Sequence, residues 1–228
     1  MRVGLEPMLD LMQRLGNPHQ SFRSIHVAGT KGKGSVSALT EAALLAAGWR
    51  VGRYGSPHVE HISERISIGG RPIGDAQLVD ALSRALDAYE AAARDATAGK
   101  DATWFDILTT SAFLAFRTAG LEWAVVEVGI GGRLDSTNVV DAEVAVVTNI
   151  ELEHTEILGS TREAIAAEKV GILKPGAVLV TSLPASDVAG RVLQARADAL
   201  GCSVRRADFT AATTIADRNA GLVGLILD

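Results

Sequence analysis

The sequence has little cysteine and no excess of positive charge. Among its 228 residues there is one cysteine, Cys202, so no disulfide can form within the chain, which agrees with a reducing compartment. The chain has 22 lysines and arginines against 27 aspartates and glutamates. It therefore has no excess of basic residues of the kind that nucleic-acid-binding proteins use. We therefore expect a cytoplasmic protein without a nucleic-acid partner.

Long hydrophobic segments are also missing. The longest apolar runs are the size of a strand, far below the roughly 20 residues of a membrane helix. The N-terminus, Met1 to Pro7, has neither the apolar stretch nor the cleavage site of a signal peptide. Because 47% of the residues are nevertheless hydrophobic, the chain can bury a core. We expect no membrane partner, and one large domain with or without the start of another.

Strand-like and helix-like segments alternate along the chain. Strands are predicted over 24–28, 50–54, 123–128, 144–148 and 177–181, and helices over 5–15, 35–47, 75–94, 104–116, 161–172 and 187–200. Near-continuous apolar strands are typical of a parallel sheet covered on both faces. The alternation predicts an α/β fold with a doubly wound, mostly parallel sheet. The last residues, 221–228, read as a strand that has just begun, which suggests a piece of a longer protein.

The helix predicted over 104–116 is rich in aromatic residues. We expect its four large rings to lie in the core rather than to form a stacking surface: Trp104, Phe105, Phe113 and Phe116. Because the helix is apolar on more than one side, it is expected to be partly buried.

A glycine-rich loop joins the first predicted strand to a helix: Gly29-Thr30-Lys31-Gly32-Lys33-Gly34-Ser35. Such a turn directs backbone N–H groups at one point, and the helix N-terminus adds partial positive charge, so the loop suits phosphate. Lys33 can reach the β- and γ-phosphates of ATP, and the Ser35 hydroxyl can contact Mg²⁺. The general P-loop has glycine in place of Val27 and serine or threonine in place of Gly34, so this is a variant. The alternative interpretation is a plain glycine turn.

Other polar residues follow predicted strands. Glu127 ends a buried strand, where open α/β sheets place ligands, and a carboxylate is a good ligand for Mg²⁺; the alternative is a cap on the next turn. From the residues alone, a structural role is the commoner one for His154, and Ser56 before a proline commonly forms a turn. Arg65 lines the path of an anionic substrate or is a solvated strand residue.

A second glycine-rich segment begins at Gly129. With Gly131 and Gly132 it predicts a tight loop, but not a dinucleotide fingerprint, because Leu134 stands at the third glycine position. The polar residues that follow can form a turn with Asx-type hydrogen bonds and have a supporting role: Asp135, Thr137 and Asn138.

Five ordered motifs resemble the Mur ligase superfamily. The Gly-Thr-x-Gly-Lys loop is similar to the ATP loop of that superfamily. A glycine directly after the lysine, here Gly34, resembles the branch that contains folylpolyglutamate synthase and dihydrofolate synthase. The other motifs are Ser56-Pro57-His58 with Glu64-Arg65-Ile66, then the segments 103–113, 127–138 and 153–172. In two places the sequence departs from the family pattern, with Asp106 for glutamate and Glu153 for aspartate. The similarity runs from about residue 16 to 176.

The resemblance implies an ATP- and Mg²⁺-dependent ligase. In that family ATP phosphorylates a folate or dihydropteroate carboxylate, and L-glutamate then attacks the acyl phosphate to give an amide. By resemblance, Lys33, His154 and Lys169 would be catalytic, and Ser56, Glu127 and His154 would hold the metal. Lys169 would be carbamylated, whereas by itself it reads as a solvated lysine near a helix C-terminus.

The resemblance also implies the domain organisation. Residues 1–228 would form one incomplete ATP-binding domain, without the family's C-terminal glutamate-binding domain. We expect a monomer. Two other functions stay open: a peptidoglycan-precursor ligase, against which Gly34 and the 127–138 segment argue, and a non-ligating nucleotide-binding fragment.

Overall fold

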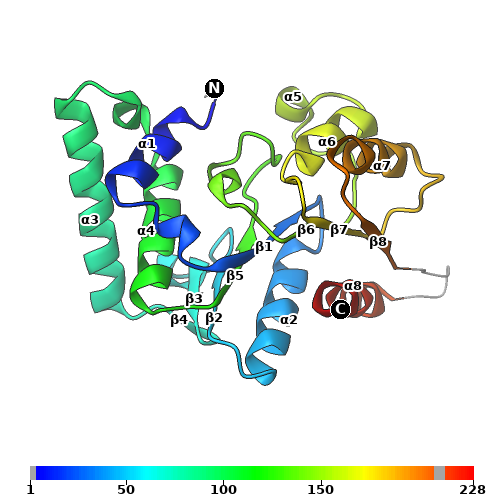
Figure 1. Ribbon diagram of the computed structural model, residues 1–228, viewed down its shortest axis with the longest axis horizontal. Helices are drawn as coiled ribbons and strands as arrows, with labels where there is room; N and C mark the ends of the chain where they lie inside the picture. The colour runs from blue at the N-terminus through cyan, green and yellow to red at the C-terminus, as the bar shows by residue number, and fades with distance from the viewer. Residues whose placement is uncertain (1–3, 208–213) are drawn as a thin grey trace.

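One eight-stranded sheet runs through the protein (Figure 1). The computed structural model describes residues 4–207 and 214–228. The strands are β1 (Arg23–Ala28), β2 (Val51–Tyr54), β3 (Ile66–Ile68), β4 (Arg71–Pro72), β5 (Trp123–Glu127), β6 (Val144–Val147), β7 (Val178–Thr181) and β8 (Val204–Arg206). Their order is β4-β3-β2-β5-β1-β6-β7-β8, and all neighbours are parallel except at β3 and β4. The predicted doubly wound, mostly parallel sheet is confirmed.

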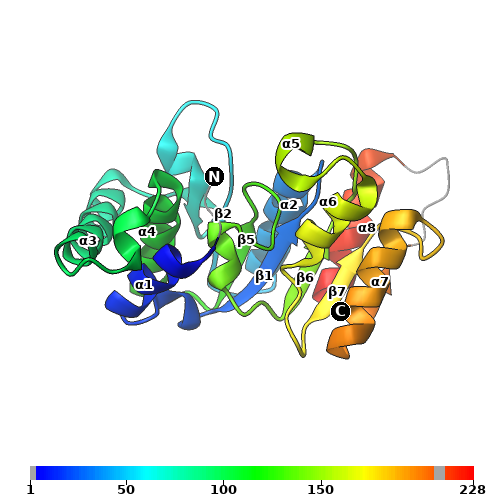
Figure 2. The same ribbon diagram turned by 90° about the horizontal axis from the view of Figure 1, so that it is seen from above.

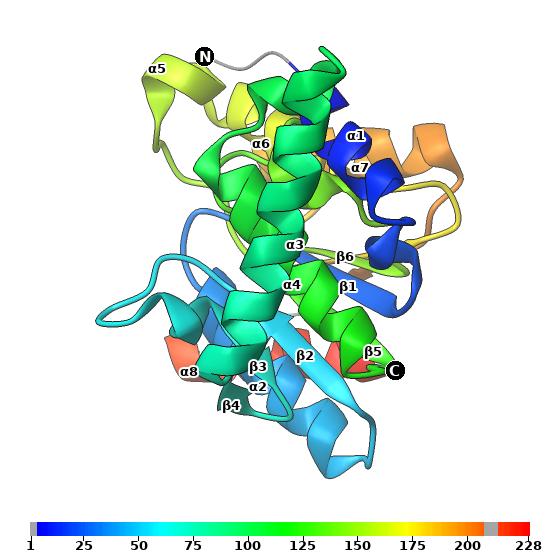
Figure 3. The ribbon, with the colours of Figure 1, turned by 90° about the vertical axis from the view of Figure 1, so that its left-hand side faces the viewer.

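Helices cover both faces of the sheet. They are α1 (Glu6–Arg14), α2 (Lys33–Ala46), α3 (Asp75–Arg94), α4 (Trp104–Thr118), α5 (Thr155–Leu158), α6 (Arg162–Val170), α7 (Val188–Leu200) and α8 (Ile215–Leu227), with short 3₁₀ turns η1 (Pro18–Gln20), η2 (Ile62–Arg65), η3 (Ala98–Asp101) and η4 (Ser136–Val139). In Figure 2, seen from above, α1 and α4 lie toward one end of the sheet and α6 and α7 toward the other. Helices α2 and α8 cover the opposite face. Helix α3 packs outside α4 (Figure 3).

The central strands are apolar on both faces because both are buried. In β5, Ala124 and Val126 join the core under α4, whereas Trp123 and Val125 face α2. Successive side chains of a strand point to opposite faces, so a strand with helices on both sides carries hydrophobic residues at every position.

The end of the chain is a helix, and the strand predicted over 221–228 is wrong. Helix α8 begins after Thr214, whose side chain accepts a hydrogen bond from the Asp217 N–H. The Asp217 carboxylate in turn accepts one from the Thr214 N–H. Such a capping box is a start signal for a helix. Leu222 and Ile226, four residues apart, are then both buried, one helical turn from each other.

One predicted core residue lies at the surface. Phe113 and Phe116 are fully buried and Phe105 is partly so, but 60% of Trp104 is exposed. Trp104 is the first residue of α4, and its ring packs against the Arg65 guanidinium, 5.2 Å away. Over the described ranges, no helix is both long enough and apolar enough to cross a bilayer.

We predict that Phe113→Ala lowers the free energy of unfolding by about 3–5 kcal/mol, because it opens a cavity in the core beneath α4. Trp104→Ala, the matched aromatic control at the surface, should cost less than about 1 kcal/mol. Urea denaturation followed by circular dichroism measures both. Equal losses would contradict the assigned core.

Candidate nucleotide-binding site

The loops that follow three neighbouring strands lie at one edge of the sheet. In the parallel register Val27 lies beside Glu127, and Ala28 lies beside Val147. The chain leaves β1, β5 and β6 at nearly the same level, so their following loops meet there. This is the edge at which open α/β sheets bind ligands.

The predicted phosphate loop connects β1 to α2. Gly29 has φ +146°, and a Cβ there would collide with the Thr148 hydroxyl, so this position requires glycine. Gly32, at φ +83°, caps α2, which starts at Lys33 and so begins two residues earlier than predicted. The loop therefore ends at the N-terminus of a 14-residue helix, which favours an anion.

The segment after β6 anchors this loop. Asn149 accepts from Thr30 N–H through its carbonyl (3.0 Å) and from Lys31 N–H through its side chain (2.7 Å). The Thr148 hydroxyl donates to the Lys31 carbonyl at 2.7 Å. Thr148 and Asn149 were not predicted from sequence, because their role depends on β6 lying next to β1.

The Lys33 amine folds back onto the loop. Its Nζ donates to the Gly29 carbonyl at 3.0 Å and lies 3.5 Å from the Thr30 carbonyl. Weak carbonyl contacts of this kind leave the ammonium available to a phosphate, which is a stronger acceptor.

Glu127 is a buried carboxylate beside the loop. It is 4% exposed, and its hydrogen bond in the described chain is a long one, 3.4 Å from the Ser56 N–H. A Cβ on Gly34 would lie 3.6 Å from Glu127 Oε2, so the variant glycine places the helix start against this carboxylate. Burial raises the pKa of Glu127, and the positive charge of Lys33 opposes the shift. A buried, weakly hydrogen-bonded carboxylate needs a cation.

Lys169 of α6 is buried, so the interpretation as a solvated lysine is wrong. The side chain is 2% exposed. Its ammonium donates to the Gly29 carbonyl at 2.9 Å and to Glu153 at 2.6 Å. Burial lowers the pKa of Lys169, the ion pair with Glu153 raises it, and the net shift is downward. Lys169 thus links the phosphate loop to the segment that carries His154.

The oxygen atoms around Glu127 suit a hard cation. The Glu127 carboxylate and the adjoining Ser56 offer the ligands that Mg²⁺ prefers. His154 is exposed, with φ +46°, and follows β6. Glu127 ends β5 and Ser56 follows β2, and both strands lie on the other side of β1. Within the described residues, no three His, Cys, Asp or Glu side chains form a cluster ready to hold a metal. The oxygen atoms of Glu127 and Ser56 therefore supply only part of the ligands that a Mg²⁺ ion needs.

The second glycine-rich segment is fastened by its own polar residues. Asp135 accepts from Thr137 N–H and from Ile130 N–H, each at 3.0 Å, which confirms the predicted Asx-type turn. Asn138 donates to the Arg133 carbonyl at 2.9 Å. A cavity of about 430 Å³ opens between this loop and α5, and Asp135 and Ile157 are among its lining residues.

A second cavity lies directly against the phosphate loop. It measures about 270 Å³ and runs between Gly32 and helix α8, with Asn149, Asn219 and Leu222 in its lining. Asn219 was not predicted as a site residue, because no helix was expected before the strand predicted over 221–228. The capping pattern of Thr214 and Asp217 was the available signal.

Arg65 joins the Ser-Pro-His loop to the start of α4. It is 8% exposed and ends η2, so the interpretation as a solvated strand residue is wrong. Its Nε donates to His58 Nδ1 at 2.8 Å. Arg65 thus helps fix the loop that carries Ser56.

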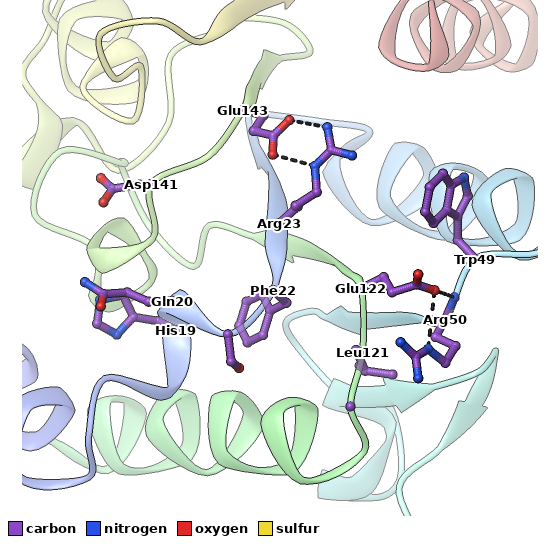
Figure 4. A pocket seen from close by; sticks show the side chains of 12 residues that line it. His19, Gln20, Phe22, Arg23, Trp49, Arg50, Leu121, Glu122, Asp141 and Glu143 are labelled. Atoms are coloured by element: carbon purple, nitrogen blue, oxygen red, sulfur yellow. Dashed lines mark hydrogen bonds and ion pairs between the residues drawn. The ribbon is translucent and has the colours of Figure 1, made fainter.

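The opposite edge of the sheet has a different character. A cavity of about 690 Å³ lies at the N-terminal ends of β1 and β5 (Figure 4). Both arginines that line it are already paired: Arg23 with Glu143 at 2.5 Å, and Arg50 with Glu122 at 3.3 Å. This cavity lies at the N-terminal ends of the strands, opposite to the edge at which open α/β sheets bind ligands, so it is poorly placed for a nucleotide.

Comparison with known proteins confirms the family that the motifs indicated. Residues 27–220 match the family described as the Mur ligase middle domain. The dihydrofolate synthase/folylpolyglutamate synthase of Bacillus subtilis is 42% identical over 184 residues, covering 80% of this chain and 42% of that protein. Mycobacterium tuberculosis folylpolyglutamate synthase complexed with ADP has a TM-score of 0.81 at 39% identity, covering 88% of this chain and 45% of that one.

A further solved structure, an FPGS–AMPPCP–folate complex, has a TM-score of 0.84 at 39% identity and covers 90% of this chain and 51% of that one. The chain thus spans about two fifths to half of the length of these relatives. It belongs to the Mur ligase family, as that family's middle domain, and resembles folylpolyglutamate and dihydrofolate synthases.

Proposed function

We propose that this chain is the ATP-binding, carboxylate-activating part of a ligase that adds L-glutamate to a folate or dihydropteroate. The observation that carries the proposal is the buried carboxylate of Glu127, set against a phosphate loop and Lys33 at the carboxyl edge of the sheet. Relatives described as complexes with ADP, or with AMPPCP and folate, support it. We further propose a cytoplasmic monomer.

The phosphate loop positions ATP for transfer of its γ-phosphoryl group. Backbone N–H groups at the start of α2 face the phosphates, and Lys33 leaves its carbonyl contacts to bind the β- and γ-phosphates. A carboxylate is a poor electrophile at neutral pH, and the acyl phosphate gives it a good leaving group for attack by the amine of glutamate. The chain's residues therefore act by positioning and by balancing charge.

Glu127 and Ser56 would bind magnesium from one side of β1, and His154 would be the third protein ligand, from the other side. The bound ion would neutralise charge on the transferring phosphoryl group. Glu127 lies deepest, so its role is to fix the position of the ion, while the N–H of Ser56 orients the carboxylate.

The two cavities at this edge fit the two larger substrates. We assign the cavity beside Asn219 to the nucleotide base, because it continues directly from Gly32 and offers an amide for hydrogen bonding. The cavity beside Asp135 and Ile157 is assigned to the acceptor, because it combines buried polar groups with an apolar wall suited to an aromatic ring system.

ADP release by the purified chain tests the function, with dihydropteroate or tetrahydrofolate, each with and without glutamate. We expect one of these acceptors to stimulate ADP release, because the γ-phosphoryl group is transferred to the acceptor carboxylate. Release that requires neither acceptor nor glutamate would favour a non-ligating ATPase. Stimulation by a peptidoglycan precursor alone would favour the other branch of the superfamily.

We predict that Lys33→Ala weakens AMPPCP binding about 10- to 100-fold, because a charge-assisted contact to phosphate is lost. Lys100→Ala in η3 is the matched control; its side chain is 45% exposed and pairs with Asp101, so AMPPCP affinity should change less than about twofold. Calorimetric titration measures both. Parental affinity in Lys33→Ala would show that the loop assignment is wrong.

Glu127→Gln should abolish the Mg²⁺ dependence of AMPPCP binding while preserving binding without metal. The substitution keeps the shape of the side chain and removes the charge that attracts the cation. Titrations in Mg²⁺ and in EDTA measure the difference, with Glu122→Gln at the opposite edge as the control. If Mg²⁺ still strengthens binding in Glu127→Gln as in the parent, Glu127 is not a metal ligand.

We further propose that Lys169 is carbamylated in the active protein, as the resemblance implies. Burial lowers its pKa and so favours the neutral amine, which is the form that captures CO₂. Acceptor-dependent ADP release should be lost in Lys169→Ala and partly restored by added short carboxylates. Full activity in Lys169→Arg, which cannot form the carbamate, would contradict the proposal.

A further inference from the structure

Arg53 is a fixed cation that the proposed reaction does not yet use. It lies on β2, and its Nε donates to Glu41 of α2 at 2.8 Å. The Glu41 side chain is 6% exposed, and its other oxygen accepts from the Ser67 hydroxyl at 2.6 Å. Because Glu41 is held from two sides, the guanidinium has little freedom to turn away.

The free end of this guanidinium points toward Glu127. A Cβ on Gly55 would lie 3.0 Å from Arg53 Nη1 and 3.1 Å from Glu127 Oε2, so the two charged atoms are at most about 6 Å apart across this glycine. Burial raises the pKa of Glu127, and the shift is opposed first by the charge of Lys33 and the Ser56 N–H and then by the charge of Arg53. Gly55 thus places no side chain of its own between the two groups.

A fixed positive charge at this place has two opposite effects. It repels a divalent cation that approaches Glu127 alone, and it attracts the phosphates of a nucleotide. The Arg53 side chain is 23% exposed and Glu127 is 4% exposed, so water and salt screen both effects only in part. When metal and nucleotide arrive together, the repulsion and the attraction largely cancel.

We propose that Arg53 is a resident counter-ion of Glu127, which makes divalent-metal binding depend on a bound nucleoside triphosphate. The site would exclude free metal ions and accept them with the phosphates. Arg53 is therefore a positioning residue that acts through Glu127. The inference rests on the proposed function, since it takes Glu127 as the carboxylate that faces the metal.

The test compares three forms of the chain: wild type, Glu41→Gln, and Glu41→Gln combined with Arg53→Met. The double substitution removes the pair together, because removing Arg53 alone would leave the buried Glu41 charge without a partner. Free Mn²⁺ binding is measured by electron paramagnetic resonance without nucleotide. AMPPCP binding is measured by calorimetry in EDTA, and Mn²⁺ binding is repeated with saturating AMPPCP.

We expect Mn²⁺ alone to bind most weakly to Glu41→Gln, more tightly to the wild type, and most tightly to the double variant. The step from Glu41→Gln to the double variant should be about three- to tenfold. AMPPCP without metal should show the reverse order, and Mn²⁺ with AMPPCP should change less than about twofold. Structural damage would weaken both ligands together, so only opposite shifts support a counter-ion.

Equal Mn²⁺ affinities in Glu41→Gln and the double variant, or a parallel loss of both ligands, would overturn the role of Arg53 while leaving the metal site intact. If Glu41→Gln and the wild type take up no Mn²⁺ even with AMPPCP, the metal assignment itself fails and the inference fails with it. Arg53→Lys, which keeps the charge and a partner for Glu41, should retain wild-type behaviour in all three measurements.

Discussion

In the unmodified chain, the buried ammonium of Lys169 holds together the edge of the sheet that carries the phosphate loop. It donates to the Gly29 carbonyl at the end of β1 and to Glu153 beyond β6, and so ties two loops into one unit. A charge at this depth is stable only with both acceptors in place, because an unpaired buried ion costs several kcal/mol. The position of the phosphate loop is therefore set by helix α6 and by the register of three parallel strands, as well as by its glycines.

Opposite charges are distributed around that unit in a way that suits a polyanion and a metal. Lys33 is held loosely by carbonyls, Lys169 is buried and paired, and Arg53 is fixed by Glu41. Glu127 faces these cations with little hydrogen bonding of its own. Such an arrangement favours ligands that bring both negative phosphate and positive metal, because each alone would leave charge unbalanced.

The parts predictable from sequence were those encoded by local pattern. The apolar strands, the glycine loop and a carboxylate at a strand end identified the sheet and the position of Glu127. By local pattern Lys169 looked like a solvated lysine, because its burial depends on α6 packing against β1 and β6, and only the resemblance placed it in the site. The end of the chain was misjudged because an apolar run with two glycines resembles a strand, although Thr214 and Asp217 form a helix start. Arg53 was missed because its role arises only when β2 and α2 face each other.

Amide hydrogen exchange with and without AMPPCP and Mg²⁺ tests the central claim most directly, because it reports where the nucleotide binds. We predict protection of residues 29–35, of the loop after Glu127 and of the first turns of α8, with unchanged exchange around the cavity lined by Arg23 and Arg50 at the opposite edge. Protection confined to that opposite cavity, with residues 29–35 exchanging as before, would contradict the account.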